Sequence, residues 1–194
     1  MGASPMGAMT LSQHATALAE FDRRVQAIQP DQWHNPTPCP EWDVRTLVNH
    51  LVTEQLWVPL LLDGATIDDV GNRFDGDHLG DDPVAAWTSA AAAAREAFAA
   101  PGALRRPVEL SYGRRSADDY CQEMTLDLTA HAWDLARGIG ADARLDEGLV
   151  REVLGFVEPQ ADQLADTGMF APPVEVAADA DAQTRLLALL GRRG

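Results

Sequence analysis

Apolar residues recur every three or four positions along most of the chain. An early stripe of this kind consists of Leu11, Leu18, Phe21, Val25 and Ile28. Its spacing predicts an amphipathic helix of about two dozen residues or fewer. Four prolines between positions 30 and 40 then end the pattern, because proline removes a backbone donor and clashes with the preceding helical turn. A non-helical connection is therefore expected after the first helix.

A second apolar stripe follows the prolines. Asp43 stands directly before it and predicts a helix N-cap, since an aspartate there accepts a hydrogen bond from the first turn. Pro59 is expected to kink this helix or to end its regular hydrogen-bond pairing, and Gly64 is expected to end it. The buried face is predicted to contain Val44, Leu47, Val48, Leu51, Val58, Leu61 and Leu62.

A third helix is predicted to begin at the pair Asp82-Pro83, because aspartate caps a helix and proline is tolerated at the first helical position. Before it, residues 63–80 are rich in Gly and Asp and are expected to form a loop. After it, Val108–Leu110 is the only strand-like segment. The remaining signals are again those of helices.

Three further helices are expected toward the end of the chain. Ser116 begins a capping pattern for a fourth helix, which runs to Gly138 or Gly140. A fifth helix is predicted over about 146–165 and a short one near 181–190. The pattern as a whole predicts an all-α bundle whose four main helices could enclose a central site.

Residues 10–194 are expected to form a single domain, because the chain of 194 residues is within the size range of one domain with a substantial core. Residues 1–9 are mostly small and rich in Gly and Ala. They lack the basic and apolar regions of a signal peptide. We expect this segment to be a disordered leader or a cloning remnant.

The charge balance narrows the range of partners. The net charge is −15, from 30 acidic and 15 basic residues, and every basic residue is arginine. Such a surface repels phosphate groups, so neither a nucleic acid nor an anionic membrane is an expected partner. No apolar run reaches the roughly 20 residues that span a bilayer. Two cysteines without a Cys-x-x-Cys motif fit a protein of the reducing cytoplasm.

The chemistry-bearing residues lie on two of the predicted helices. Asp127 and His131 are four residues apart and therefore share one helix face, and His50 lies on the apolar stripe of the second helix. A carboxylate and an imidazole directed into a core need a partner. A divalent metal is one such partner, with His50 completing a three-ligand site that keeps an open position. These donors suit zinc, nickel, iron or manganese.

Other interpretations of the same residues stay open. A histidine on an apolar face is often a core histidine with satisfied hydrogen bonds, and Asp127 could simply bond to His131. Glu54 shares a face with His50 and could be a ligand, a proton carrier or a residue at the edge of the stripe. Tyr120 lies on the same helix face as Asp127.

Four further side chains are not expected to take part in a site. Cys39, between two prolines, has no base near it in the sequence. Cys121 is expected to be a small buried residue. Asp134 and Arg137 are predicted to form a surface ion pair, because residues three apart are neighbours on a helix.

Three segments together resemble one known family: Thr37–His50, Asp127–Arg137 and Leu186–Arg192. They are similar to the actinobacterial branch of the DinB-like helical bundles, which is related to the metal-binding domain of mycothiol-dependent maleylpyruvate isomerase. The resemblance extends from about residue 10 to the end of the chain. It implies a DinB-like up-down four-helix bundle with an additional C-terminal helical segment.

The resemblance also implies a divalent ion, usually zinc or nickel, held by three side chains. The family's ligands match His50, Asp127 and His131, although the isomerase has glutamate where this chain has Asp127. The shorter carboxylate is expected to shift the ion or lengthen its contact. The isomerase has a separate C-terminal domain that this chain is expected to lack, which argues against maleylpyruvate as its substrate.

The function expected from these residues and the resemblance is that of a mycothiol-dependent transferase or isomerase. The ion would bind the sulfur of a small thiol, and the thiolate would attack a small electrophile. Glu54, Tyr120 and Trp133 are expected to shape the pocket. Two alternatives remain: a non-catalytic metal- or ligand-binding bundle that acts through dimerisation as a homodimer, and a metal-independent hydrophobic carrier.

Overall fold

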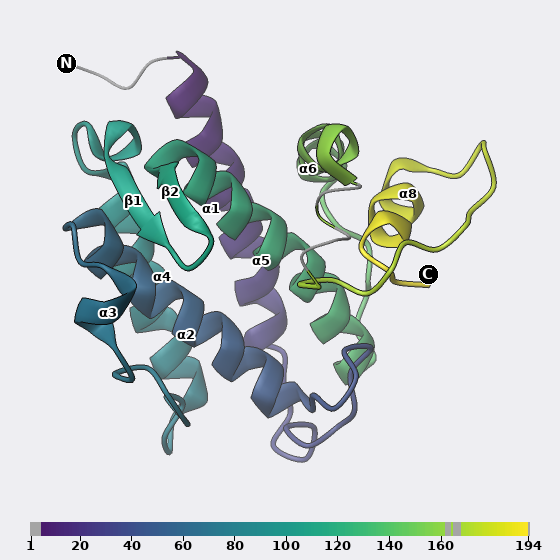
Figure 1. Ribbon diagram of the computed structural model, residues 1–194. Helices are drawn as coiled ribbons and strands as arrows, with labels where there is room; N and C mark the ends of the chain where they lie inside the picture. The colour runs from purple at the N-terminus through teal and green to yellow at the C-terminus, as the bar shows by residue number, and fades with distance from the viewer. Residues whose placement is uncertain (1–4, 162–163, 165–167, 194) are drawn as a thin grey trace.

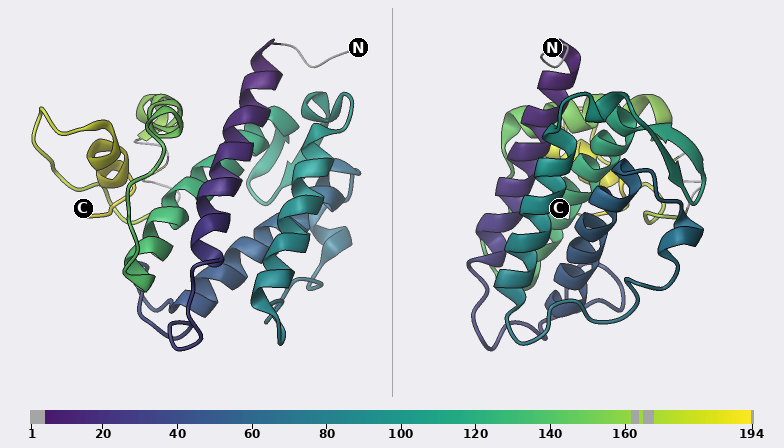
Figure 2. Two further views of the ribbon diagram at one scale, coloured as in Figure 1. Left: turned by 180° about the vertical axis from the view of Figure 1, so that it is seen from behind. Right: turned by 90° about the vertical axis from the view of Figure 1, so that its left-hand side faces the viewer.

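Four long helices form the body of the molecule (Figure 1). The computed structural model describes residues 5–161, 164 and 168–193. The long helices are α1 (Pro5–Val25), α2 (Val44–Leu62), α4 (Pro83–Ala99) and α5 (Ala117–Ile139). Helix α1 packs against α5 and α4, and α2 packs against α4 and α5, so the four enclose a common core (Figure 2). The predicted all-α four-helix bundle is confirmed.

The helices begin where the capping residues predict. The carboxylate of Asp43 accepts a hydrogen bond from the Thr46 amide at the start of α2. Asp82 caps α4 and Ser116 caps α5 in the same way. At its other end α5 stops at Gly140, whose φ of 68° lies in the left-handed region that glycine adopts easily. Local hydrogen bonding therefore sets the bounds of the helices that bear the site.

The start of the chain differs from the expectation for residues 1–9. Helix α1 already begins at Pro5, and Gly7 and Thr10 are buried, so the described part of this segment is helical. Residues 1–4 lie outside the described part of the chain. At its other end α1 stops at Val25 rather than at Ile28, which packs against the core from the following turn.

Short elements occupy the two segments that connect α2 to α4 and α4 to α5. Within the predicted loop, Thr66 caps the one-turn helix α3 (Ile67–Val70). Strands β1 (Pro107–Leu110) and β2 (Gly113–Ser116) form an antiparallel hairpin, after the 3-10 helix η1 (Ala103–Arg105). The strand-like segment is thus confirmed.

A C-terminal layer packs beside α5 on one side of the bundle (Figure 1). It contains α6 (Glu147–Val157), the 3-10 helix η2 (Glu158–Gln160) and α8 (Ala182–Leu189). The fifth helix predicted to reach 165 leaves regular α-geometry after Val157, and part of its predicted end lies outside the described residues. The short last helix agrees with its prediction. Among the described residues, no helix combines the length and apolar character needed to cross a membrane.

Candidate metal centre

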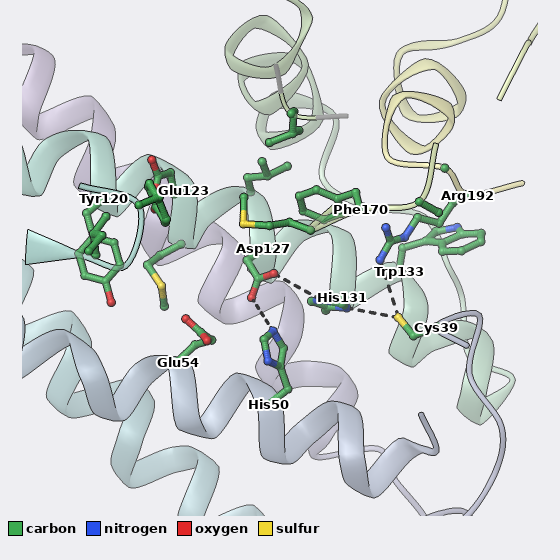
Figure 3. Close-up of a pocket in the computed structure, with 18 of the residues that line it drawn as sticks. Cys39, His50, Glu54, Tyr120, Glu123, Asp127, His131, Trp133, Phe170 and Arg192 are labelled. Atoms are coloured by element: carbon green, nitrogen blue, oxygen red, sulfur yellow. Dashed lines mark hydrogen bonds and ion pairs between the residues drawn. The ribbon is translucent and has the colours of Figure 1, made fainter. Parts of the chain in front are cut away.

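The three predicted ligands meet between α2 and α5 (Figure 3). The Nε2 atom of His50 lies 3.3 Å from Oδ2 of Asp127, and Nε2 of His131 lies 3.3 Å from its Oδ1. One donor atom from each residue falls within 4.8 Å of the others. The helical spacing brings Asp127 and His131 together, and the packing of α2 against α5 adds His50.

An indole that the sequence interpretation did not single out supports both imidazoles. The ring centroid of Trp42 lies 4.9 Å from that of His50 and 5.7 Å from that of His131. Trp42 comes from the proline-rich connection, directly before the cap of α2. The two histidines are therefore restrained by packing as well as by polar contacts.

A second carboxylate contacts His131 at Nδ1, the ring nitrogen that does not face Asp127. The Nδ1 atom of His131 lies 2.9 Å from Oδ2 of Asp134, and Asp134 is completely buried. This contact occupies Nδ1 and leaves Nε2 facing Asp127, which is the arrangement typical of histidines that bind metals. The predicted surface pair of Asp134 with Arg137 is therefore wrong. Asp134 pairs with Arg192 at 2.8 Å, and the guanidinium of Arg137 lies over the ring of Trp133.

The electrostatics of the cluster favour positive charge. Burial alone would raise the pKa of Asp127, but the adjacent His131 and His50 outweigh it and hold this pKa well below its usual range. Burial would lower the pKa of His131, but Asp127 and Asp134 raise it far above its usual value. The pKa of His50 is also raised, because Asp127 and Glu54 outweigh its burial. The site thus stabilises cations beside an ionised carboxylate.

The residues fit a divalent ion. Oδ2 of Asp127 is buried and has no partner with hydrogen-bond geometry among the described residues, even though His50 is 3.3 Å away. A buried carboxylate oxygen without such a partner is costly, and an ion coordinated there would satisfy it. Two imidazoles and one carboxylate are a ligand set found in zinc and non-haem iron sites.

Cys39 lies at the edge of the same cluster, although no base is near it in the sequence. Its Sγ is 3.7 Å from Nδ1 of His131 and 3.2 Å from Oδ2 of Asp134. These three side chains form a second group with possible ligand atoms, but the guanidinium of Arg192 already supplies the cation beside Asp134. These partners are 92 or more positions away from Cys39 in the sequence, so no local pattern predicts them.

The ligands face a large cavity of about 1490 Å³. All three weaker candidates, Glu54, Tyr120 and Trp133, line it. Burial raises the pKa of Glu54, and Asp127 adds to this effect. In Figure 3 the carboxylate of Glu54 lies between His50 and Tyr120. The candidates therefore share one space with the predicted ligands.

The two ends of the cavity have different linings. Glu54, Glu123 and Tyr120 lie on one side of the ligands (Figure 3), where the hydroxyl of Tyr112 donates a hydrogen bond to Glu123 and the guanidinium of Arg115 lies over the Tyr112 ring. Trp133, Phe170 and Arg192 lie on the other side. Neither Tyr112 nor Glu123 was singled out from the sequence. Glu123 lies four residues before Asp127 and shares its helix face, whereas Tyr112 lies in the turn between β1 and β2, where no helical spacing indicates it. The predicted metal site stands between these ends.

Known proteins match both the sequence and the fold. Residues 14–136 match the model of the mycothiol maleylpyruvate isomerase N-terminal domain. Uncharacterised proteins from two strains of Mycobacterium tuberculosis are 34% identical over 148 residues, which cover 74% of this chain and 75% of each relative.

Solved structures agree with the fold. The crystal structure of the mycothiol-dependent maleylpyruvate isomerase superposes with a TM-score of 0.62 at 14% identity, covering 82% of this chain and 72% of that one. A mutant of that enzyme has the same TM-score and coverage at 13% identity. These likenesses concern the fold, and the sequence match supplies the family. The chain belongs to the mycothiol maleylpyruvate isomerase N-terminal domain family.

Proposed function

We propose that this protein is a metal-dependent enzyme that activates a low-molecular-weight thiol and joins it to a small electrophile. The observation that carries this proposal is the cluster of His50, Asp127 and His131 facing a cavity of about 1490 Å³. Three protein ligands would leave a further coordination position of a divalent ion free for a thiol, as in catalytic metal sites. Mycothiol is the proposed thiol, since the family and the superposed isomerase are named for it.

The three ligands come from two rigid helices, which favours a fixed coordination geometry. Zinc is the first choice, and nickel, iron and manganese accept the same donors. A divalent ion held there supplies Lewis acidity, which lowers the pKa of a coordinated thiol and keeps its sulfur as the reactive thiolate. Asp134 holds the ring of His131 with Nε2 toward the ion position.

Glu54 is proposed as the acceptor of the thiol proton. It lies one helical turn from His50 and lines the same cavity. Its carboxylate is a stronger base than usual because burial raises its pKa, and a general base is most effective when its pKa approaches the working pH. The proton would move from the thiol sulfur to a carboxylate oxygen of Glu54. The sulfur lone pair would form an S–C bond to the electrophile as the leaving group departs with its bonding electrons, which for monobromobimane is bromide.

The size and lining of the cavity suit two ligands at once. Its volume exceeds the 300–1,000 Å³ typical of sites for one small molecule. Aromatic side chains on both sides of the ligands would exclude water from the reacting atoms, with Tyr120 on one side and Trp133 and Phe170 on the other (Figure 3). A thiol and an electrophile can therefore approach the site from opposite ends of the cavity.

The test combines metal analysis with a thiol-dependence assay. Purified protein is reloaded with zinc, nickel, iron or manganese and assayed with monobromobimane as the electrophile and mycothiol, cysteine or glutathione as the thiol. We expect about one equivalent of bound metal and a rate above background with mycothiol. Glu54→Gln should keep the metal but lower the rate by about 10²-fold or more. Glu96→Gln, an exposed position on α4, is the matched control.

Two results would contradict the proposal in different ways. Protein that takes up no metal after reloading would reduce His50, Asp127 and His131 to a hydrogen-bonded cluster. Stoichiometric metal without turnover for any thiol would favour the non-catalytic metal-binding bundle instead. A rate that is unchanged in Glu54→Gln would remove only the role of this carboxylate.

A further inference from the structure

The carboxylate of Asp134 connects the metal-site histidine to the C-terminal layer. Asp134 is completely buried on α5, and three side chains surround it. Nδ1 of His131 lies 2.9 Å away, and Cys39 donates its S–H at 3.2 Å. Arg192 approaches both oxygens, with Nη2 at 2.8 Å and Nε at 3.3 Å. Such a two-point contact fixes the plane of a carboxylate as well as its charge.

Arg192 is itself held in place. Its Nη1 donates to the carbonyl oxygen of Leu190 at 2.7 Å, and its guanidinium lies 5.3 Å from the ring centroid of Phe170. Only 11% of its side chain is exposed. A mobile surface arginine would be largely hydrated and free to change rotamer. This one is preorganised toward Asp134.

The turn before Arg192 requires a glycine. Gly191 has a φ of 76°, in the left-handed region, where a side chain is strained. A Cβ at this position would also lie 2.5 Å from the carbonyl oxygen of Ala171, which is too close for any residue but glycine. The backbone is thus packed tightly where the chain turns to direct Arg192 onto Asp134.

We propose that Arg192 is a positioning residue for the metal centre, acting on His131 through Asp134. This inference rests on the proposed function, because it needs His131 to be a ligand. With His131 neutral as a metal ligand and Arg192 removed, Asp134 would be a buried carboxylate with no cationic side chain in contact, which is a costly state. The carboxylate would then turn or become hydrated, and the ring of His131 would lose the contact that directs Nε2 toward Asp127.

The same connection links metal binding to the docking of the C-terminal layer. If the docked arginine favours the ion, the bound ion must favour the docked arginine by the same free energy. The segment that contains α8 and Arg192 therefore belongs to the metal centre, although it contributes no ligand. Metal-loaded protein is expected to protect this segment from proteolysis better than metal-free protein.

The experiment measures Co²⁺ affinity by competition with a chelator, together with the visible absorption spectrum of the bound Co²⁺. Substitution of a residue that hydrogen-bonds to a metal-ligating histidine typically weakens metal binding by about 10- to 100-fold. We expect Arg192→Gln to weaken it by about 10-fold or more and to shift the spectrum. Arg185→Gln is the matched control. Arg185 lies on α8, and among the described residues its salt bridge is with Glu158, on the surface and away from Asp134. This variant should stay within about twofold of wild type.

Two additional variants separate positioning from folding. Gly191→Ala leaves every charge in place but displaces the turn, so it should reproduce the loss of affinity. Arg192→Lys keeps the charge without the two-point contact and should recover part of the affinity. Added guanidinium ion should also restore part of the Co²⁺ spectrum in Arg192→Gln if the protein is folded. If Arg192→Gln fails to fold, the Co²⁺ affinity of Arg192→Lys tests the inference instead. An Arg192→Lys variant with the Co²⁺ affinity and spectrum of wild type would contradict the inference.

The outcomes distinguish the two proposals. Wild-type protein that binds Co²⁺ no better than His131→Ala overturns the metal site, and this inference with it. Stoichiometric Co²⁺ in wild type, with the same affinity and spectrum in Arg192→Gln and Arg185→Gln, overturns only the role of Arg192. Loss of affinity in Arg192→Gln and Gly191→Ala but not in Arg185→Gln supports it.

Discussion

Two buried histidines of this protein show opposite electrostatics. His14 on α1 and His131 on α5 are 1% and 5% exposed. Around His14 the neighbours are apolar or positively charged: it contacts the ring of Phe98, and its Nε2 has no hydrogen-bond partner among the described residues. Each ring nitrogen of His131 instead faces a carboxylate, from Asp127 or Asp134.

The direction of the pKa shift follows from this difference. Burial, aided by Arg95, lowers the pKa of His14 to about 4. Two carboxylates overcome burial at His131 and raise its pKa well above the usual value. Burial on an apolar stripe therefore does not identify a functional histidine. The identifying feature is the set of carboxylates that faces both nitrogens.

The largest expected contrast between the two histidines is in metal binding. His131→Ala should lose the bound ion, because it removes one of three ligands, whereas His14→Leu should retain about one equivalent. Elemental analysis of both purified variants measures this directly. Chelation should also destabilise wild type and His14→Leu equally, by about 4 kcal/mol if the free ion is near 1,000 times Kd. Full metal content in His131→Ala would mean that the site lies elsewhere.

The second contrast is in the dependence of stability on pH. In the unfolded chain His14 becomes protonated as the pH falls below its usual pKa of 6.5. In the folded protein it stays neutral until the pH approaches its lowered pKa of about 4. Its contribution to stability is therefore complete above pH 6.5 and is lost as the pH falls toward 4, by about 3 kcal/mol in total. His14→Leu should remove this component from the urea-unfolding free energies measured between pH 7 and 4.

Other groups also titrate in this range, so the quantity to compare is the difference between wild type and His14→Leu at each pH. A difference that stays constant from pH 7 to 4 would show that His14 is protonated as easily in the folded state as in the unfolded state. The desolvation of this ring would then be smaller than its burial indicates.

The smallest change in unfolding free energy is expected for an exposed histidine that pairs with a carboxylate. Nδ1 of His34 lies 3.0 Å from Asp43, and 81% of the His34 side chain is exposed. Exposed pairs contribute little, because water screens them and the side chains lose entropy. His34→Ala should change the unfolding free energy by less than about 1 kcal/mol. A larger loss would indicate that His34 supports the Asp43 cap of α2.

Local rules explain why much of the fold could be predicted from the sequence. Asp43, Asp82 and Ser116 set the starts of three helices through hydrogen bonds to residues three positions later. Asp127 and His131 share a face for the equally local reason of helical spacing. The meeting of His50 with this pair depends on how α2 packs against α5, which spacing alone does not determine.

The polar partners behind the site are the features that local rules miss. The spacing of Asp134 and Arg137 predicts a surface pair, but Asp134 points into the core and bonds to Arg192, 58 positions away. Cys39 reaches the same cluster across 92 positions. Contacts of this kind depend on tertiary packing, and neither helical periodicity nor capping indicates them.

The contact of Trp42 with both imidazoles has an optical consequence. Its ring centroid lies 4.9 Å from that of His50 and 5.7 Å from that of His131, so this indole is a fluorophore beside the proposed ion. Open-shell ions such as Co²⁺ and Ni²⁺ quench nearby indole emission by energy transfer, whereas Zn²⁺, with its filled d shell, does not absorb visible or near-ultraviolet light. The protein thus carries its own spectroscopic label, and Trp42→Phe would identify the part of its fluorescence that reports which ion is bound.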